Sequence, residues 1–498
     1  MNIINIYQTK PAWLLAVLLI VRFAGCPVAE GPTVHFTAEP TSGDPPLTVQ
    51  FTDGSTPGAA PITAWEWSFG DGDASNKQHP VHTYTGVGRY AVSLTVTTSL
   101  GSDTETKEDY IATTGGGEGE GEGEGEGEGE GEGEGEGEGW ARVFEGALAH
   151  CVKETSDGGF IVAGYAEPSG ATDQDMYLMK TNATGTRTWD AAFGGDDDET
   201  AYWVEETSDG GFVAAGQSGL DIYIVKTDSA GSLAWDRILG SANVDVARCI
   251  RETSDGGLII AGQSLSLYGQ QARIYLIKTD SIGTPDWDRM LSMGDLDRVY
   301  CVEETSDAGF VLGGQTVSYD EGQADVYLAK TDASGNLDWE KVFGGEEWDS
   351  AYCVQETSDY GFILAGETQS FGAGGYDVYL VKTDVRGDFL WQQTFGGEQQ
   401  DVANSVQQTG DNGFVLAGYT YSFGSGSADV YLVKTDAAGR AGWEKTFGSE
   451  KTDAANSVAQ TQDGGYILAG HTRAFGDGLY LIKTDAAGSA PGTPPEPE

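Results

Sequence analysis

The chain has 498 residues, of which 78 are acidic and 27 basic, so its formal charge at pH 7 is −51. This surplus of negative charge repels nucleic acids and anionic membrane surfaces and excludes both as direct partners. Glycine supplies 74 residues and the hydrophobic share is 39%, which together indicate folded, turn-rich domains and exclude a wholly disordered chain.

The N-terminus predicts export. Residues 13–21 are nine consecutive apolar residues after Lys10, too few to span a bilayer but typical of a signal-peptide core. The following Phe23-Ala24-Gly25-Cys26 resembles a bacterial lipobox, which implies cleavage before Cys26 and lipidation of its thiol. We expect residues 1–25 to be a signal peptide of the lipoprotein type. The alternative is an ordinary secretory signal with an incidental cysteine.

Residues 32–114 predict a small antiparallel sandwich. Five runs alternate apolar and polar residues between turn signals: Thr33–Ala38, Leu47–Asp53, Ala64–Phe69, Gly88–Thr97 and Thr104–Ala112.

Two signature strings in this segment resemble the polycystic kidney disease (PKD) domain. They are Trp67-Ser68-Phe69-Gly70-Asp71-Gly72 with His82-Thr83-Tyr84, and the strand from Gly88 to Val96. The resemblance implies an Ig-like β-sandwich that serves as a surface spacer or adhesion module. The residues agree, because Gly70 permits a tight turn and Trp67 supplies core bulk. Asp71 and Asp73 could bind a metal, but an Asx turn is the favoured interpretation.

Residues 115–139 hold three glycines and then eleven Glu-Gly pairs. Nothing in this segment can form a core and its charges repel one another, so we predict a disordered, extended linker. The proline-rich residues 491–498 predict a disordered tail.

Residues 140–490 are a repeat array. Seven tryptophans mark seven copies, at positions 140, 189, 235, 287, 339, 391 and 443. Each copy holds four short strand patterns and no helical period, which predicts a seven-bladed β-propeller within an all-β protein. The last copy lacks a following tryptophan strand, so we expect the strand at Trp140 to complete the final blade. An open solenoid is the alternative.

Every copy carries Thr-x-Asp-x-Gly and a strand lysine before Thr-Asp or Thr-Asn. The first motif resembles the Asp-box hairpin of sialidase-type propellers. We interpret it as a hairpin in which Asp accepts hydrogen bonds from the turn backbone and Gly takes a positive φ, with the lysine neutralising a nearby Asp. A ring of seven ligand sites is the alternative. Cysteines recur at one position and predict small buried residues, not disulfides or metal ligands: Cys151, Cys249, Cys301 and Cys353.

Two groups of residues are candidate sites. A row of carboxylates at strand starts could bind calcium if it faced a central channel, or could accept hydrogen bonds from local amides: Asp245, Asp297, Asp349, Asp401 and Asp453. Aromatic residues in variable loops could stack on sugars, contact a protein partner or pack between blades: Tyr319, Phe371 and Phe423.

No catalytic motif is present among the five histidines, the serines or the cysteines. We therefore expect a monomeric binding platform at the cell surface, anchored to the membrane only through its lipid, that recognises extracellular polysaccharide or protein. It needs no cofactor apart from the candidate calcium. The whole chain resembles bacterial and archaeal envelope proteins that join PKD domains to propellers. A carbohydrate-active enzyme (lyase or glycosidase) and a purely structural envelope component are the alternatives.

Overall fold

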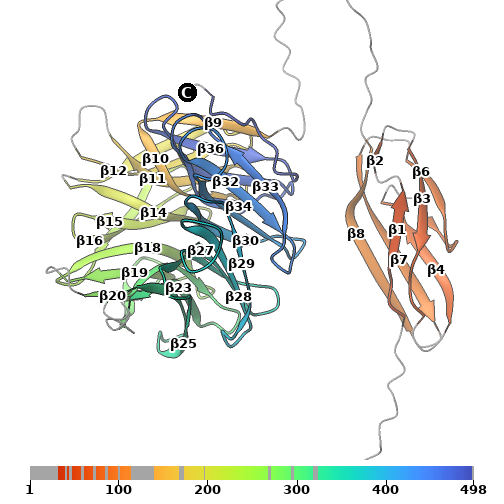
Figure 1. The fold of residues 1–498 in the computed structure, drawn as a ribbon, viewed down its shortest axis with the longest axis horizontal. Coiled ribbons are helices and arrows are strands. Elements are labelled where there is room, and N and C mark those ends of the chain that lie inside the picture. Colours follow the sequence, from red (N-terminus) through yellow and green to blue (C-terminus); the bar gives the residue numbers. More distant parts are fainter. Residues whose placement is uncertain are drawn as a thin grey trace, which may run out of the picture. The chain divides into compact units, whose positions relative to one another are not determined.

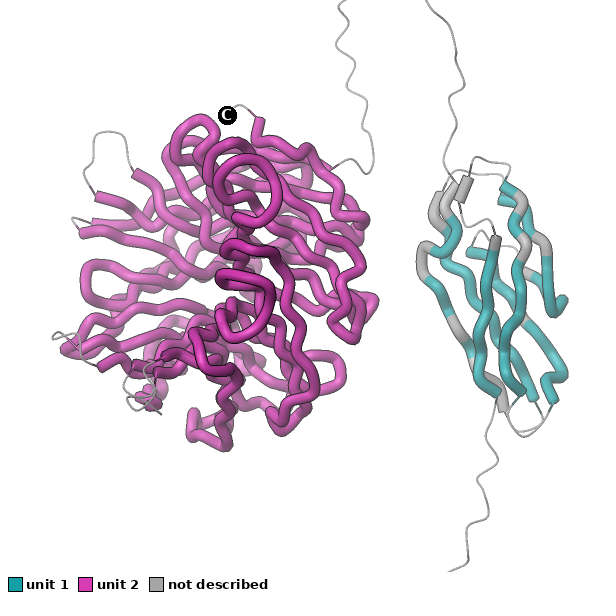
Figure 2. The backbone as a smooth tube through the Cα atoms, viewed as in Figure 1, with its two compact units in different colours: residues 1–131 teal, residues 132–498 magenta. Residues whose placement is uncertain are grey.

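A computed structural model describes residues 32–39, 42–43, 47–57, 61–70, 74–84, 88–98, 101–113, 139–167, 173–195, 197–266, 271–292, 296–317 and 323–495. The chain forms two compact units, residues 1–131 and 132–498 (Figure 2). The predicted signal peptide with Cys26, the linker up to residue 138, Asp71, Asp73 and Tyr319 lie outside the described residues. In the described part of the chain, no helix is long and apolar enough to cross a membrane.

The first unit is a two-sheet sandwich (Figure 1). One sheet has the order β1-β3-β6 and the other the order β2-β8-β7-β4-β5. The strands are β1 (Phe36–Glu39), β2 (Ser42–Gly43), β3 (Leu47–Asp53), β4 (Ile62–Ser68), β5 (Ala74–Ser75), β6 (Val81–Tyr84), β7 (Gly88–Thr98) and β8 (Gly101–Thr113). The five predicted strands are present, and the short β2, β5 and β6 were not predicted.

Aromatic side chains fill the core of this sandwich. Trp67 is 2% exposed and its ring meets that of Phe36 edge-on, with centroids 5.1 Å apart. Gly70 has a φ of 81°, and a Cβ there would lie 2.4 Å from the Ala91 carbonyl oxygen. The predicted need for glycine at this turn is confirmed, because both the left-handed backbone and the close approach exclude a side chain.

The second unit contains seven four-stranded antiparallel sheets within its described residues, as predicted for a seven-bladed propeller. The first four are β10–β13 (Ala147–Glu154, Phe160–Ala166, Asp175–Thr181, Arg187–Phe193), β14–β17 (Glu199–Glu206, Phe212–Ser218, Asp221–Thr227, Leu233–Leu239), β18–β21 (Val244–Glu252, Leu258–Leu265, Ala272–Thr279, Pro285–Leu291) and β22–β25 (Arg298–Glu304, Phe310–Val317, Ala324–Thr331, Leu337–Phe343). The others are β26–β29 (Asp349–Glu356, Phe362–Thr368, Asp377–Thr383, Phe389–Phe395), β30–β33 (Asp401–Gln408, Phe414–Thr420, Asp429–Thr435, Ala441–Phe447) and β34–β36 (Asp453–Gln460, Tyr466–Thr472, Gly478–Thr484) with β9 (Trp140–Glu145).

The ring closes as the sequence predicts. β9 pairs antiparallel with β36, with Trp140 opposite Lys483 and Phe144 opposite Leu479. The first strand of each sheet contacts the first strand of the next, and β34 contacts β10 in the same way. These seven strands are therefore the innermost strands of the ring, and each repeat's tryptophan strand is the outermost strand of the preceding blade.

Burial follows position within a blade. The second and third strands are buried on both faces, as in Val378, Leu380 and Val381 of β28, because neighbouring blades cover them. The outermost strands are largely exposed, as in β17 and β21. The predicted apolar runs thus pack between blades.

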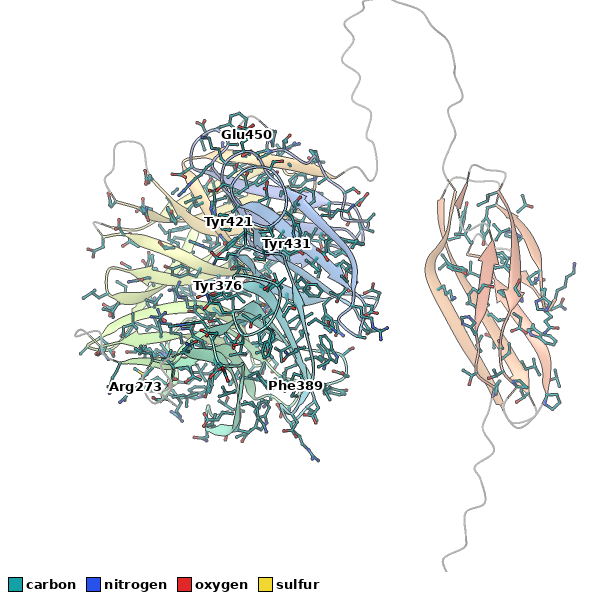
Figure 3. The ribbon with its side chains drawn as sticks, in the orientation of Figure 1. Arg273, Tyr376, Phe389, Tyr421, Tyr431 and Glu450 are labelled. Carbon is teal, nitrogen blue, oxygen red and sulfur yellow. The ribbon has the colours of Figure 1, made fainter. Side chains whose placement is uncertain are left out.

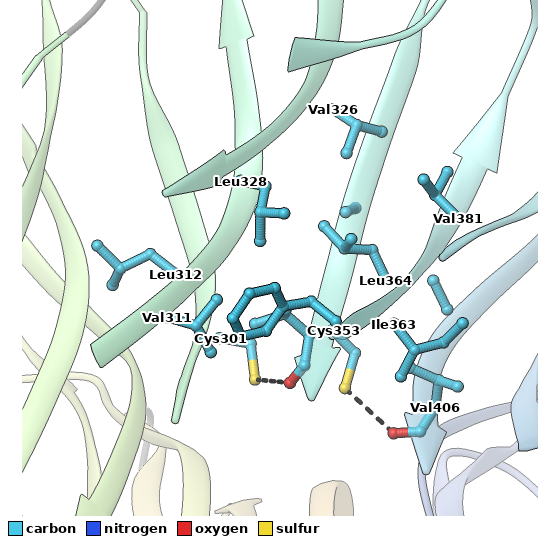
Figure 4. Close-up of a cluster of buried hydrophobic side chains, with 14 of the residues drawn as sticks. Cys301, Val311, Leu312, Val326, Leu328, Cys353, Ile363, Leu364, Val381 and Val406 are labelled. Atoms are coloured by element: carbon cyan, nitrogen blue, oxygen red, sulfur yellow. Dashed lines mark hydrogen bonds between the residues drawn. The ribbon is translucent and has the colours of Figure 1, made fainter. Parts of the chain in front are cut away.

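The four cysteines of the repeats are buried free thiols, as predicted, and they also bridge blades. Cys301 Sγ donates to the Val354 carbonyl oxygen at 3.4 Å, and Cys353 Sγ donates to that of Val406 at 3.5 Å (Figure 4). In the last blade, Ser457 Oγ donates to the Val152 oxygen of the first at 3.3 Å.

Part of the predicted disordered tail is ordered. The Gly448 amide donates to the Gly492 carbonyl oxygen at 2.9 Å, and Pro494 is buried. Residues 491–495 therefore pack against the last blades, a contact that composition alone did not indicate.

Candidate functional site

The Thr-x-Asp-x-Gly hairpins are structural joints. In the first blade, Asp157 Oδ1 accepts hydrogen bonds from Thr155 Oγ1 at 2.6 Å, from the Gly159 amide at 3.0 Å and from Lys180 Nζ at 2.9 Å. The Lys–Asp ion pair recurs in all seven blades. Lysine also lowers the pKa of Asp157 to about 2, together with the hydrogen bonds and against the opposing effect of burial. The structural interpretation of the aspartate and of the lysine is confirmed.

The role of the motif's final glycine was predicted wrongly. Positive φ belongs to the residue before it, as in Gly158 at 76°, and in three blades that residue is not glycine: Ala308, Tyr360 and Asn412. Gly159 is needed for another reason. A Cβ on it would lie 2.1 Å from the Thr181 oxygen and 2.5 Å from Lys180 Nζ. Glycine therefore makes room for the lysine that holds the aspartate.

A glutamate or glutamine from the following blade caps each hairpin. The Ser306 amide donates to Glu356 Oε2 at 2.8 Å. The same contact closes the ring, because the Gln462 amide in the last blade donates to Glu154 Oε2 in the first at 2.9 Å. A backbone amide of each hairpin is thus bonded to a side chain of the following blade.

The five aspartates considered for calcium are fully buried. Their carboxylates accept local hydrogen bonds; Asp349 Oδ2, for example, accepts from the Gly345 amide at 2.8 Å and from Ser370 Oγ at 2.6 Å. Among the described residues, no group of three or more His, Cys, Asp or Glu side chains could hold a metal ion. Calcium binding at these aspartates stays a prediction that a titration can test. The observed hydrogen bonds from local amides are those expected under the alternative interpretation.

Most of these aspartates face a second carboxylate from the preceding blade, which the sequence did not reveal. A Cβ on Gly344 would lie 2.1 Å from Asp325 Oδ1 and 2.6 Å from Asp349 Oδ2. Five such pairs flank an equivalent glycine: Asp175–Glu199, Asp221–Asp245, Asp325–Asp349, Asp377–Asp401 and Asp429–Asp453. Burial, with a contribution from Asp453, raises the pKa of Asp429 to about 6.

The two described loop aromatics partly pack and partly face solvent. The Phe371 ring lies 5.6 Å from that of Tyr379 and packs against the core. Phe423 lies 5.8 Å from Tyr431 but stays 42% exposed. Both rings therefore cover a tyrosine of their own blade, and Phe423 also offers an open face.

A cluster of tyrosines forms on the innermost strand of the fifth blade and on the second strands and adjoining loops of the fifth and sixth blades. Tyr352 donates from its hydroxyl to Glu367 Oε1 at 2.6 Å. The Tyr419 and Tyr421 rings meet edge-on with centroids 6.0 Å apart, and Tyr421 is 38% exposed. Tyr376 lies close enough to Glu367 for that carboxylate to contribute to its raised pKa, of which burial is the larger cause. We call Tyr352, Glu367, Tyr376, Tyr419 and Tyr421 the axial tyrosine cluster.

This cluster combines flat apolar rings with a few polar groups. Burial raises the pKa of Glu367. Gln400 Nε2 donates to the Tyr419 hydroxyl at 3.3 Å. Tyr376 and Tyr421 lie toward the middle of the propeller in Figure 3, whereas Phe389 lies nearer its edge. Aromatic rings with convergent hydrogen-bonding groups are typical of sites for small organic ligands and saccharides.

The sequence did not single out this cluster, because its members occupy different columns of the repeat. Tyr352 belongs to an innermost strand, Tyr419 to a second strand, and Tyr376 and Tyr421 to loops. A column-by-column comparison of the seven copies would have marked the variable polar positions of the innermost strands.

Comparisons with known proteins match the two units separately. The PKD1 domain of Vibrio anguillarum Epp is 28% identical over 17% of this chain and 99% of that domain, with a TM-score of 0.16. The PKD1 domain of the Vibrio cholerae metalloprotease PrtV is 30% identical over 17% of this chain and 100% of that domain, with a TM-score of 0.15. Puromycin hydrolase is 14% identical over 69% of this chain and 52% of its own, about half its length, with a TM-score of 0.48.

A family model described as the PKD domain matches residues 29–113. The matched segment contains the complete two-sheet sandwich and its Trp67 core. Residues 29–113 of this chain therefore belong to the PKD domain family.

Proposed function

We propose that this protein is an exported, lipid-anchored surface protein whose propeller binds an extracellular polysaccharide at the axial tyrosine cluster. The signal-like residues 13–21 and Cys26 support export and anchoring, and a PKD domain fits a surface or adhesion role. The observation that carries the binding role is the partly open Tyr419–Tyr421 pair beside Glu367 and Tyr352. Tyrosine rings stack on the apolar faces of sugars, while the hydroxyls and the carboxylate bond sugar hydroxyls.

The repeated features do not carry this proposal, because contacts between blades account for them. The tyrosine cluster differs: the positions equivalent to Tyr352 and Glu367 carry His150 and Tyr165 in the first blade, and Asn456 and His471 in the last. A feature confined to part of the ring is not required for building a blade. Variation of this kind on a rigid scaffold is where binding sites usually arise.

Isothermal titration of the full chain against saccharides chosen from a glycan array tests the proposal. We expect Tyr421→Ala and Glu367→Gln each to weaken binding at least about tenfold, or about 1.4 kcal/mol. Phe389→Ala is the matched control, because Phe389 is an aromatic of an outermost strand that is 51% exposed. Equal affinity in all variants would refute the assignment of the site. A protein ligand in place of a glycan would refute the saccharide class.

A reducing-sugar release assay on the same glycans separates binding from hydrolysis or lyase activity. We expect binding without turnover. Turnover that Glu367→Gln abolishes would show an enzyme. Metabolic labelling with a fatty acid tests the anchor, and Cys26→Ser should remove the label.

A further inference from the structure

Three cations of the first and third blades surround two aromatic rings of the second. Arg248 on β18 places its guanidinium carbon 4.2 Å from the centre of the Tyr202 ring on β14. Lys153 Nζ on β10 lies 4.5 Å from the Trp203 ring centre, and the Arg251 guanidinium carbon lies 4.6 Å from it. We call Lys153, Arg248 and Arg251 the cationic cluster. All three lie on innermost strands of the ring.

The cluster has more positive charge than its carboxylate neighbours balance. Arg251 is paired with Glu205 at 4.0 Å, whereas Lys153 and Arg248 form no ion pair within the described part of the chain. Burial raises the pKa of Glu205 and raises that of Glu303 to about 7. Glu303 is therefore only partly ionised at neutral pH. His150, beside Tyr202, is neutral there because burial lowers its pKa to about 4.

Several hydrogen-bond donors in this region lack an acceptor. Buried atoms without a partner include the Nε atoms of Arg248 and Arg251 and the Trp203 indole nitrogen, together with the Oε2 atoms of Glu205 and Glu303. A buried donor without an acceptor costs about 1–3 kcal/mol, so acceptors from water or a ligand are expected here. Solvent does reach the region, because the Arg251 and Glu205 side chains keep 22% and 26% of their surfaces exposed.

These cations are not part of the pattern that the blades share. Where the third blade has Arg248, the fifth has Tyr352 and the sixth has Asn404; where it has Arg251, they have Gln355 and Gln407. The lysine–aspartate pairs recur in all seven blades, and the cations do not. They are also exceptional in a chain of formal charge −51. Retaining partly buried cations beside aromatic rings in such a chain favours an anionic ligand.

We propose that the cationic cluster binds a carboxylate group of an acidic, uronate-containing saccharide. This inference rests on the proposed function and names its ligand class. Arg248 and Tyr352 occupy equivalent positions on innermost strands, so the cations and the tyrosine cluster surround the same axis. The planar guanidinium groups match the two oxygens of a carboxylate, and Tyr202 offers a ring to the sugar.

The test compares trigalacturonate with its methyl ester, which keeps the sugar but lacks the charge. Titration of the full chain at about 0.15 M salt limits long-range repulsion. We expect the acid to bind at least tenfold more tightly than the ester. Arg248→Met and Lys153→Met should each remove this preference for the acid over the ester, while Arg248→Lys should retain part of it.

Arg237→Met is the matched control, because Arg237 lies over Trp235 at 5.2 Å on the outermost strand β17. A loss of preference in this variant equal to that in Arg248→Met would overturn the inference. Equal affinity for acid and ester would also overturn it. If neutral saccharides still bound in a Tyr421-dependent manner, only this inference would fail; if no saccharide bound, the proposed function would fail too.

Discussion

Buried Lys382 offers a test of what the repeated lysine–aspartate pair contributes to the propeller. Its side chain is 5% exposed, and its Nζ donates to Asp359 Oδ1 at 3.0 Å and to the Thr383 oxygen at 2.8 Å. Asp359→Asn keeps an acceptor for Thr357 and Gly361 but removes the charge that faces the lysine. Breaking a fully buried pair costs about 3–5 kcal/mol. Asp359 is 61% exposed, so screening by water reduces the expected loss to about 1.5–2 kcal/mol.

A double-mutant cycle separates the ion pair from packing. Lys382→Met keeps the apolar stem and removes the buried charge, so we expect a loss of about 1 kcal/mol from the bond to Thr383. The double variant should be less destabilised than the sum of the single variants by about 1 kcal/mol. Urea unfolding followed by tryptophan fluorescence measures each free energy of unfolding.

The exposed pair of Lys341 and Asp388 is the control, because Lys341→Met should cost less than about 0.5 kcal/mol. Additivity of the two Lys382–Asp359 variants within about 0.3 kcal/mol would refute the electrostatic reasoning.

Tyr360 has a φ of 64°, so Tyr360→Gly should raise the free energy of unfolding by about 0.5–1 kcal/mol, and a decrease would contradict the strain assignment. A Cβ on Gly366 would lie 1.9 Å from the Ser350 carbonyl oxygen, so Gly366→Ala should lower the thermal midpoint of unfolding. Gly146→Ala is the control, because a Cβ there meets nothing within 4 Å and the substitution costs only the strain of a positive φ. The raised pKa of Asp429 means that the folded state holds its proton more tightly than the unfolded state, so stability from this group falls as pH rises from about 4 to about 6, and Asp429→Asn should remove that dependence in a pH series of melting curves. If calcium binds at Asp349 and its equivalents, adding it should raise the melting temperature; an unchanged value would reject the site.

The propeller was predictable because its signals repeat. A tryptophan marks each copy, and a lysine and an aspartate recur at fixed positions. The extra strand at Trp140 predicted closure of the ring, and it pairs with β36. The sandwich was predictable from alternation and from the turn at Gly70.

The sites were harder to predict, because contacts between blades are invisible in a single repeat. Asp325 and Asp349 belong to different sheets and meet only through ring geometry. The cations on β10 and β18 differ from the residues that most repeats carry at those positions, so a consensus of the repeats does not show them. We predicted that Gly159 was needed for its backbone conformation. The structure shows instead that a side chain there would collide with Lys180, which lies about twenty positions later in the sequence.

The pairing of β9 with β36 joins the beginning and the end of the propeller sequence. An emerging chain would expose β9 first and then have to wait for its partner until every other blade had been made. The propeller can therefore acquire its final shape only after β36 has been made. A chain that ended before β36 would leave β35 and β9 without their shared partner. Proteases could recognise such unpaired strands in an incomplete chain.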